Sequence, residues 1–160
     1  MKLEKTNNFN GVLVILIIIF SLTASSYGFF SNNKIFENKT FLAISGEAVD
    51  LYGRGLYHND SVSGASQIRA QDIVTLLVGI PLLTVSFILS NKKSLKGKLL
   101  LTGTMGYFLY TYTSYSFLVM YNKFFLMYVV LMSLSFFCFI IGNNNDDNFY
   151  DTFRGKCFNC

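Results

Sequence analysis

Residues 73–90 read IVTLLVGIPLLTVSFILS, a run without a single Asp, Glu, Lys, Arg or His. A helix needs about 20 apolar residues to cross the ~30 Å hydrocarbon core of a bilayer, because each residue advances it by about 1.5 Å. The run also lacks the apolar–polar alternation of a barrel strand. Pro81 lies inside it, where membrane helices tolerate a proline and often bend. The stretch therefore predicts a transmembrane helix.

Three more uncharged runs surround this one. They are residues 11–30 (GVLVILIIIFSLTASSYGFF), 99–121 (LLLTGTMGYFLYTYTSYSFLVMY) and 124–141 (FFLMYVVLMSLSFFCFII). The last two are joined so closely that they must form an antiparallel hairpin. We predict an all-α fold, a four-transmembrane-helix bundle, as one integral membrane domain over residues 1–160. Residues 31–72 are predicted to form an ordered external loop, and residues 142–160 a cytoplasmic tail.

The composition agrees with a membrane protein. Hydrophobic residues make up 52% of the 160 residues and charged residues only 14%, whereas a soluble domain carries about 25% charged residues. Disordered, collagen-like and disulfide-rich chains are excluded. A net charge of +4 is too small to indicate a nucleic-acid partner. The expected partner is the lipid bilayer, and other membrane subunits or a homo-oligomer remain open.

Lysine and arginine are unevenly distributed between the predicted loops. Eight of the 13 lie in the N-terminus, in the tail, and in the link NKKSLKGK at residues 91–98. The other five lie in the long loop and at Lys123. The positive-inside rule therefore places both termini in the cytoplasm of a cell-membrane protein.

The first run has a second interpretation. Lys2, Lys5, an apolar stretch and then Ala24-Ser25-Ser26 resemble a secretory signal with its cleavage site. The run continues to Phe30 and so reaches full spanning length, which favours a retained helix. Cleavage would leave three spans and an external N-terminus.

The predicted external loop gathers the candidate catalytic residues. Gly53 and Gly55 permit a tight turn that presents Arg54. Asp72 directly precedes the predicted span and could cap it, and at least one of Arg54 and Arg69 is expected to pair with a loop carboxylate. The loop is either an external binding or catalytic platform or a lid held by Arg–Asp pairs, so whether the protein is an enzyme stays open. The candidates are Asp50, Arg54, His58, Asp60, Arg69 and Asp72.

The third run is unusually rich in hydroxyl groups. Tyr107, Tyr110 and Ser114 share one helical stripe, and hydroxyls in hydrocarbon need partners. We expect this stripe to face the other helices, either as a binding pocket or through interhelical hydrogen bonds. The predicted spans hold no ionisable group of the kind that proton-coupled transport uses.

The cysteines do not predict a metal site. Cys138 lies inside the fourth run and is expected to be a packed apolar residue. Cys157 and Cys160 form a C-F-N-C pair, which is half of a zinc site or a redox pair. Two further ligands are missing unless a dimer supplies them, so no cofactor is expected. His58 is the single histidine, which excludes a haem held by paired histidines.

Several motifs resemble a known group of proteins. These are DLYGRGLY (50–57), RAQDIVTL (69–76), GIPLL (79–83), YFLYTYxSYxF (107–117) and YNxFFLxYV (121–129). They are similar to an uncharacterised family of small prokaryotic multi-pass membrane proteins. The resemblance covers about residues 50–135 and implies about four membrane helices. It implies no activity and no catalytic residue, and it does not include the C-F-N-C tail.

The sequence thus favours a non-enzymatic membrane protein, either a subunit or a binder of small solutes or lipid. The alternative is a membrane-embedded enzyme whose active site is formed by the external loop at the helix mouths. The two differ in whether the loop side chains converge on a concave site.

Overall fold

The computed structural model describes residues 2–157 except 37–38, 43–45 and 93, and it describes side chains within residues 11–142, without that of Leu95. The described chain is mostly helical. The helices are α1 (Lys2–Phe30), α2 (Val62–Val74), the π-helix η1 (Thr75–Gly79), α3 (Ile80–Asn91), α4 (Leu95–Leu118) and α5 (Phe125–Cys157). The strands are β1 (Thr40–Leu42) and β2 (Ala48–Asp50).

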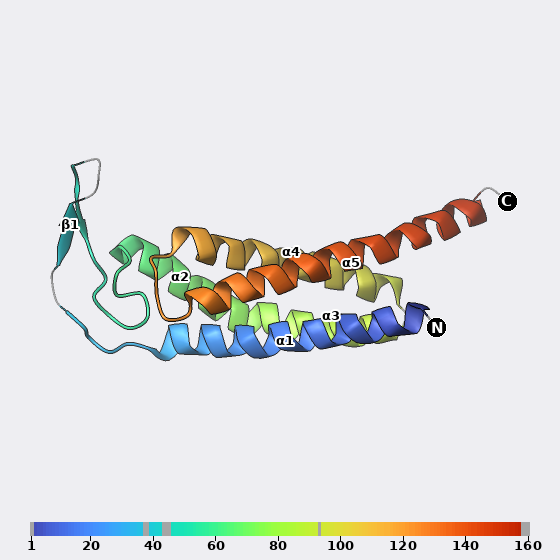
Figure 1. Cartoon of the computed structure of the whole chain (residues 1–160), viewed down its shortest axis with the longest axis horizontal. Coiled ribbons are helices and arrows are strands. Elements are labelled where there is room, and N and C mark those ends of the chain that lie inside the picture. Colours follow the sequence, from blue (N-terminus) through green and yellow to red (C-terminus); the bar gives the residue numbers. More distant parts are fainter. Residues whose placement is uncertain (1, 37–38, 43–45, 93, 158–160) are drawn as a thin grey trace.

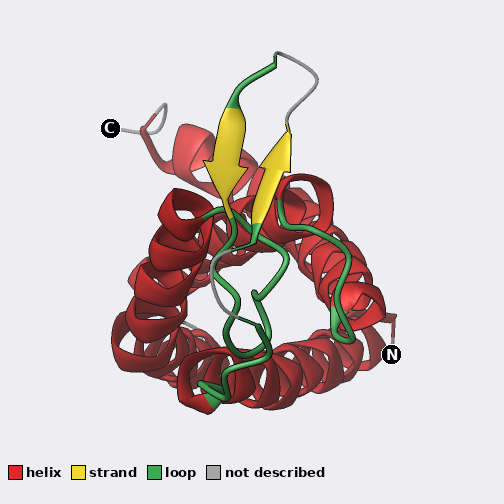
Figure 2. Cartoon of the chain, turned by 90° about the vertical axis from the view of Figure 1, so that its left-hand side faces the viewer, coloured by secondary structure: helices red, strands yellow, loops and turns green. Residues whose placement is uncertain are grey.

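The helices lie side by side along one axis (Figure 1). The three segments α2, η1 and α3 follow one another without a break and form a single rod. This rod packs on α4, and α4 packs on α5, while α1 contacts both the rod and α5. The two termini lie at the same end of the bundle (Figure 1). The long loop after α1 covers the opposite end, as Figure 2 shows.

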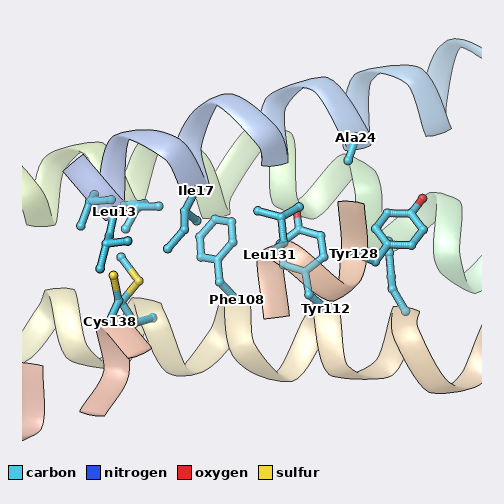
Figure 3. Close-up of a cluster of buried hydrophobic side chains, with 12 residues drawn as sticks. Leu13, Ile17, Ala24, Phe108, Tyr112, Tyr128, Leu131 and Cys138 are labelled. Atoms are coloured by element: carbon cyan, nitrogen blue, oxygen red, sulfur yellow. The ribbon is translucent and has the colours of Figure 1, made fainter. Parts of the chain in front are cut away.

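The core runs along the inside of the bundle and is rich in aromatic rings (Figure 3). Ile17 of α1, Phe108 of α4 and Leu131 of α5 are fully buried within it. Tyr112 and Tyr128 stack with their ring centroids 6.3 Å apart. Cys138 is buried in the same cluster with a free thiol, as the sequence predicted. Large apolar side chains also remain exposed on the outside, as expected for helices that face lipid.

The prediction of a helical membrane protein is confirmed at a coarse level. In the described part of the chain, three helices are long and apolar enough to cross a membrane, at Gly11–Phe30, Val62–Asn91 and Phe125–Gly142. Helix α4 is not among them, because its glycines and its many hydroxyl-bearing side chains lower its mean hydropathy. It nevertheless packs in the bundle, in contact with α3 and α5. A small antiparallel hairpin, with Phe41 opposite Val49, was not predicted.

The rod formed by α2, η1 and α3 begins earlier than the helix predicted at residues 73–90. Its first helix starts at Val62, where the Ser61 side chain accepts a hydrogen bond from the Gly64 amide at 3.1 Å. Asp72 therefore lies inside a helix, and its predicted role as the cap is wrong. The apolar run does not include this part because polar and charged side chains, such as Gln67, Arg69 and Asp72, interrupt the hydrophobic pattern.

The π-helix lies directly before Pro81. The Ile80 amide donates to the Thr75 carbonyl, which is a wider turn than in an α-helix. A proline lacks an amide hydrogen and crowds the preceding turn, so a local widening lets the rod continue. At this level Gly79 faces α4, and a Cβ on it would lie 3.0 Å from Cε1 of Tyr107.

The α3–α4 turn depends on the absence of a side chain at Gly97. A Cβ there would lie 2.5 Å from the Leu89 carbonyl carbon and 2.6 Å from the Ser90 amide. Because both neighbours are backbone atoms, we expect Gly97→Ala to lower the free energy of unfolding by about 1–3 kcal/mol, measured by denaturant titration in micelles. Gly103→Ala is the control, because no atom lies within 4 Å of its Cβ position. Equal stability of the two variants would contradict this packing.

Candidate functional site

A buried carboxylate lies where the long loop meets the helices. Asp72 of α2 is only 1% exposed. Its Oδ2 accepts a hydrogen bond of 2.7 Å from the Tyr57 hydroxyl, and its Oδ1 lies 3.0 Å from the Tyr115 hydroxyl. Ser25 of α1 also faces the carboxylate. We call Asp72, Tyr57, Tyr115 and Tyr128 the carboxylate–tyrosine cluster.

Tyr57 brings the loop into this cluster. Its side chain is 1% exposed, and its hydroxyl lies 3.4 Å from the Tyr128 hydroxyl of α5. Burial raises the pKa of the Tyr57 phenol well above its usual range, and the neighbouring Tyr128 and Asp72 raise it further. The phenol is therefore neutral and available as a donor. The loop thus contacts α2 and α5 through one hydroxyl group.

Gly28 gives the cluster its space on α1. A Cβ at this position would lie 2.3 Å from Oδ2 of Asp72 and 2.6 Å from the Tyr57 oxygen. Any side chain here would displace the hydrogen bond itself. At Gly28 helix α1 therefore meets the cluster with backbone alone.

The loop turns as the sequence predicted. Gly53 and Gly55 have φ angles of +69° and +60°, a backbone conformation that residues other than glycine rarely adopt. A Cβ at Gly55 would lie 2.0 Å from the Ser31 carbonyl oxygen. Arg54, between the two glycines, is exposed. The turn directs the following residues, Leu56 and Tyr57, into the protein.

The other acidic and basic candidates have separate roles. Asp60 is buried, and its Oδ1 accepts a 2.9 Å hydrogen bond from the amide of Met120, two residues after the end of α4. Burial raises the pKa of Asp60, while that hydrogen bond and His58 oppose the rise. Nδ1 of His58 lies 3.1 Å from the Gly55 carbonyl oxygen. Asp50 is exposed on β2.

Arg69 contacts aromatic residues instead of an acid. Its guanidinium donates to the Tyr52 hydroxyl and, at 3.3 Å, to the Phe29 carbonyl, and it lies over both rings. Arg54 is exposed in its turn. The expected arginine–carboxylate pairing is wrong, since among these described side chains neither arginine bonds to a carboxylate. The six candidate catalytic residues do not converge on one site.

The prediction that the hydroxyl stripe of α4 faces other helices is confirmed for Tyr107 and wrong for Tyr110. Tyr110 is 73% exposed on the outside of the bundle, which contradicts the expectation for this residue. Tyr107 bonds to Gln71 at 2.9 Å and lies 3.1 Å from the Thr75 hydroxyl. Ser114 is partly buried. The inward stripe is instead Thr104, Phe108, Thr111, Tyr112 and Tyr115, because the helix is rotated from the predicted orientation by about one residue.

Three hydroxyl groups extend the polar interior beyond the cluster. The side-chain oxygens of Ser21, Tyr112 and Ser135 are buried and make no hydrogen bond of ordinary geometry to the described residues, although Ser21 faces the Tyr112 hydroxyl. They come from α1, α4 and α5. Buried hydroxyls are normally satisfied by protein or by ordered water. The bundle interior therefore has unused hydrogen-bonding capacity.

An apolar groove lies on the outside of the bundle between the α2–α3 rod and α4. It has a volume of about 500 Å³. Most of its wall is aliphatic, while Tyr107 and Thr104 supply hydroxyls and Lys96 a charge. Its lining residues are Val74, Val78, Gly79, Leu82, Lys96, Leu99, Leu100, Gly103, Thr104 and Tyr107.

The described residues contain no group of three or more His, Cys, Asp or Glu side chains that could hold a metal ion. The C-F-N-C pair is outside this statement, because Cys160 and the side chain of Cys157 lie outside the described residues. For these two cysteines the sequence-based interpretation, half of a zinc site that lacks its other ligands, therefore stays untested.

Comparison with known proteins found no match: no family model, no curated protein and no solved structure corresponds to the chain. The fold by itself defines the class, a helical membrane protein with three apolar helices of spanning length in its described part. Its particular features are the carboxylate–tyrosine cluster and the apolar groove.

The hydroxyl of Tyr57 is expected to stabilise the whole fold. Tyr57→Phe keeps the ring but removes the donor to a buried carboxylate, so the free energy of unfolding should fall by about 1–3 kcal/mol. Tyr110→Phe is the matched control, because this hydroxyl is on the exposed face, and it should change stability by less than about 0.5 kcal/mol. Denaturant titration in micelles measures both. Similar effects of the two changes would show that the loop is not held through this bond.

Proposed function

We propose that the protein is a non-enzymatic multi-pass protein of the cell membrane that binds lipid, with α4 as a fourth spanning helix. The observation that supports this most directly is the groove between the α2–α3 rod and α4. A long, mostly aliphatic groove on a lipid-facing surface suits an acyl chain better than a polar solute. Packing between apolar neighbours allows α4 to span despite its hydroxyl groups.

The length of the groove agrees with one lipid leaflet. Along α4 it extends from Lys96 to Tyr107, which is about 16 Å at 1.5 Å per residue. Half of a hydrocarbon core of ~30 Å is about 15 Å. An acyl chain in the groove would therefore reach from the membrane surface to about its centre.

The charge at one end suggests the kind of lipid. Lys96 is exposed in the first turn of α4 and is the only charged residue among those that line the groove. A lysine at a membrane edge extends its ammonium group towards the headgroups. A phosphate on the lipid would meet this charge while the chain occupies the aliphatic wall. We therefore propose a phospholipid as the ligand.

The orientation follows from charge distribution. The lysine-rich link at residues 91–98 and both ends of the chain carry most of the basic residues, and the positive-inside rule assigns them to the cytoplasm. The two termini lie at the same end of the bundle (Figure 1), which is compatible with this orientation. The groove would then lie in the inner leaflet.

Filling the groove should displace the lipid. Gly103 lines it, and no atom lies within 4 Å of a Cβ there, so the side chain of Gly103→Leu starts in open space and extends into the groove. We expect at least a several-fold loss of phospholipid retained by the purified protein, measured by native mass spectrometry. Val85→Leu, on an exposed part of α3 outside the groove, should retain wild-type lipid. Unchanged retention in Gly103→Leu would refute the groove as the binding site.

The orientation can be tested by labelling with a membrane-impermeant thiol reagent in intact cells. In a background with the three native cysteines changed to serine, a cysteine at Ser63 should react, because Ser63 is exposed in the first turn of α2. A cysteine at Ser94, in the lysine-rich link, should react only after the cells are lysed. The opposite labelling pattern would reverse the orientation and place the groove in the outer leaflet.

A further inference from the structure

The hydrogen atoms around Tyr115 can be counted. Its oxygen lies 3.0 Å from the Ile68 carbonyl oxygen and 3.0 Å from Oδ1 of Asp72. A tyrosine hydroxyl carries one hydrogen, and a backbone carbonyl can only accept. If Asp72 is ionised, the Ile68 carbonyl and Oδ1 of Asp72 can both only accept. The single hydrogen of Tyr115 then serves one of the two contacts, and the other has none. If Oδ1 carries a proton, it donates to Tyr115, which then donates to Ile68.

The hydrogen bonds at Oδ2, the other carboxylate oxygen of Asp72, are consistent with a proton on Oδ1. Tyr57 donates to Oδ2 at 2.7 Å, and the Tyr128 hydroxyl, 3.4 Å from the Tyr57 oxygen, can donate to Tyr57. With one proton on Asp72 the donors form a single chain that runs from Tyr128 through Tyr57, Asp72 and Tyr115 to the Ile68 carbonyl. Every contact in this chain then contains one hydrogen.

Most of the groups around Asp72 carry no charge. The titratable groups that face it are phenols: Tyr57 from the loop, Tyr112 and Tyr115 from α4, and Tyr128 from α5. Helix α1 contributes Ser25 and the backbone at Gly28.

The nearby cation lies on α2 itself. It is Arg69, whose charge attracts the ionised form of Asp72, but whose hydrogen bonds go to Tyr52 and to the Phe29 carbonyl. A buried carboxylate without a paired cation is costly to ionise, so such groups usually hold a proton.

We propose that Asp72 is a proton-binding site at the junction of the external loop and the helix bundle. The proton comes from water and binds Oδ1. When it leaves, the hydroxyl hydrogen of Tyr115 turns from the Ile68 carbonyl to Oδ1, and no covalent bond other than that of the proton changes. Ionisable groups inside membrane bundles commonly bind or relay protons. This proposal does not depend on lipid binding in the groove.

Infrared spectroscopy of the full-length protein in lipid vesicles tests the site. A protonated carboxylic acid has a carbonyl stretching band that a carboxylate lacks. We expect this band in the wild-type protein at neutral pH, and we expect Asp72→Asn to remove it. Asp50→Asn, which changes an exposed aspartate, should leave the band unchanged.

A second variant keeps the test decisive if Asp72→Asn does not fold. Tyr115→Phe removes the acceptor of the acid O–H while the acid itself stays, so the band should shift to higher frequency without losing intensity. Absence of the acid band in folded wild-type protein at neutral pH would overturn the proposal. A band that is unaffected by Tyr115→Phe would also overturn it, because the acid would then be another residue.

Discussion

The hydrogen bond between Tyr57 and Asp72 joins two parts of the molecule that are otherwise different in kind. One part is a bundle of helices whose outer surface is apolar, and the other is a polar loop that covers one end of that bundle. Inside a membrane bundle no bulk water competes for a carboxylate, so its partners must come from the protein. The loop supplies one of these partners and thereby takes a fixed place on the helices.

Several local features serve this contact. The positive φ angles at Gly53 and Gly55 turn the chain so that Tyr57 enters the bundle. The missing side chain at Gly28 leaves room for the carboxylate and the phenol. Tyr115 and Tyr128 approach the same group from α4 and α5. The cluster therefore connects the loop with all four rods of the bundle at one place.

Helix α4 contributes different side chains to the groove and to the bundle interior. Helix α4 presents Phe108, Tyr112 and Tyr115 to the interior, whereas Lys96, Gly103 and Tyr107 line the outer groove. Tyr107 is close to both regions, since it bonds to Gln71 and lies against Gly79. The hydroxyl-rich sequence of α4 thus provides interior hydrogen bonds without making the lipid-facing surface strongly polar.

The sequence alone determined the class of the protein, the approximate positions of the apolar helices and the tight turn around Arg54. These follow from local properties, namely the length of uncharged runs and the conformational freedom of glycine. Only the tertiary structure placed Asp72 inside the bundle, directed Tyr110 outwards and gave Arg69 aromatic partners. The physical reason is that a polar residue within a helix is tolerated when other segments bond to it, and those segments are distant in the chain. The rotation of a helix about its axis is likewise set by the surfaces it packs against, which a stripe of hydroxyls in one segment does not specify.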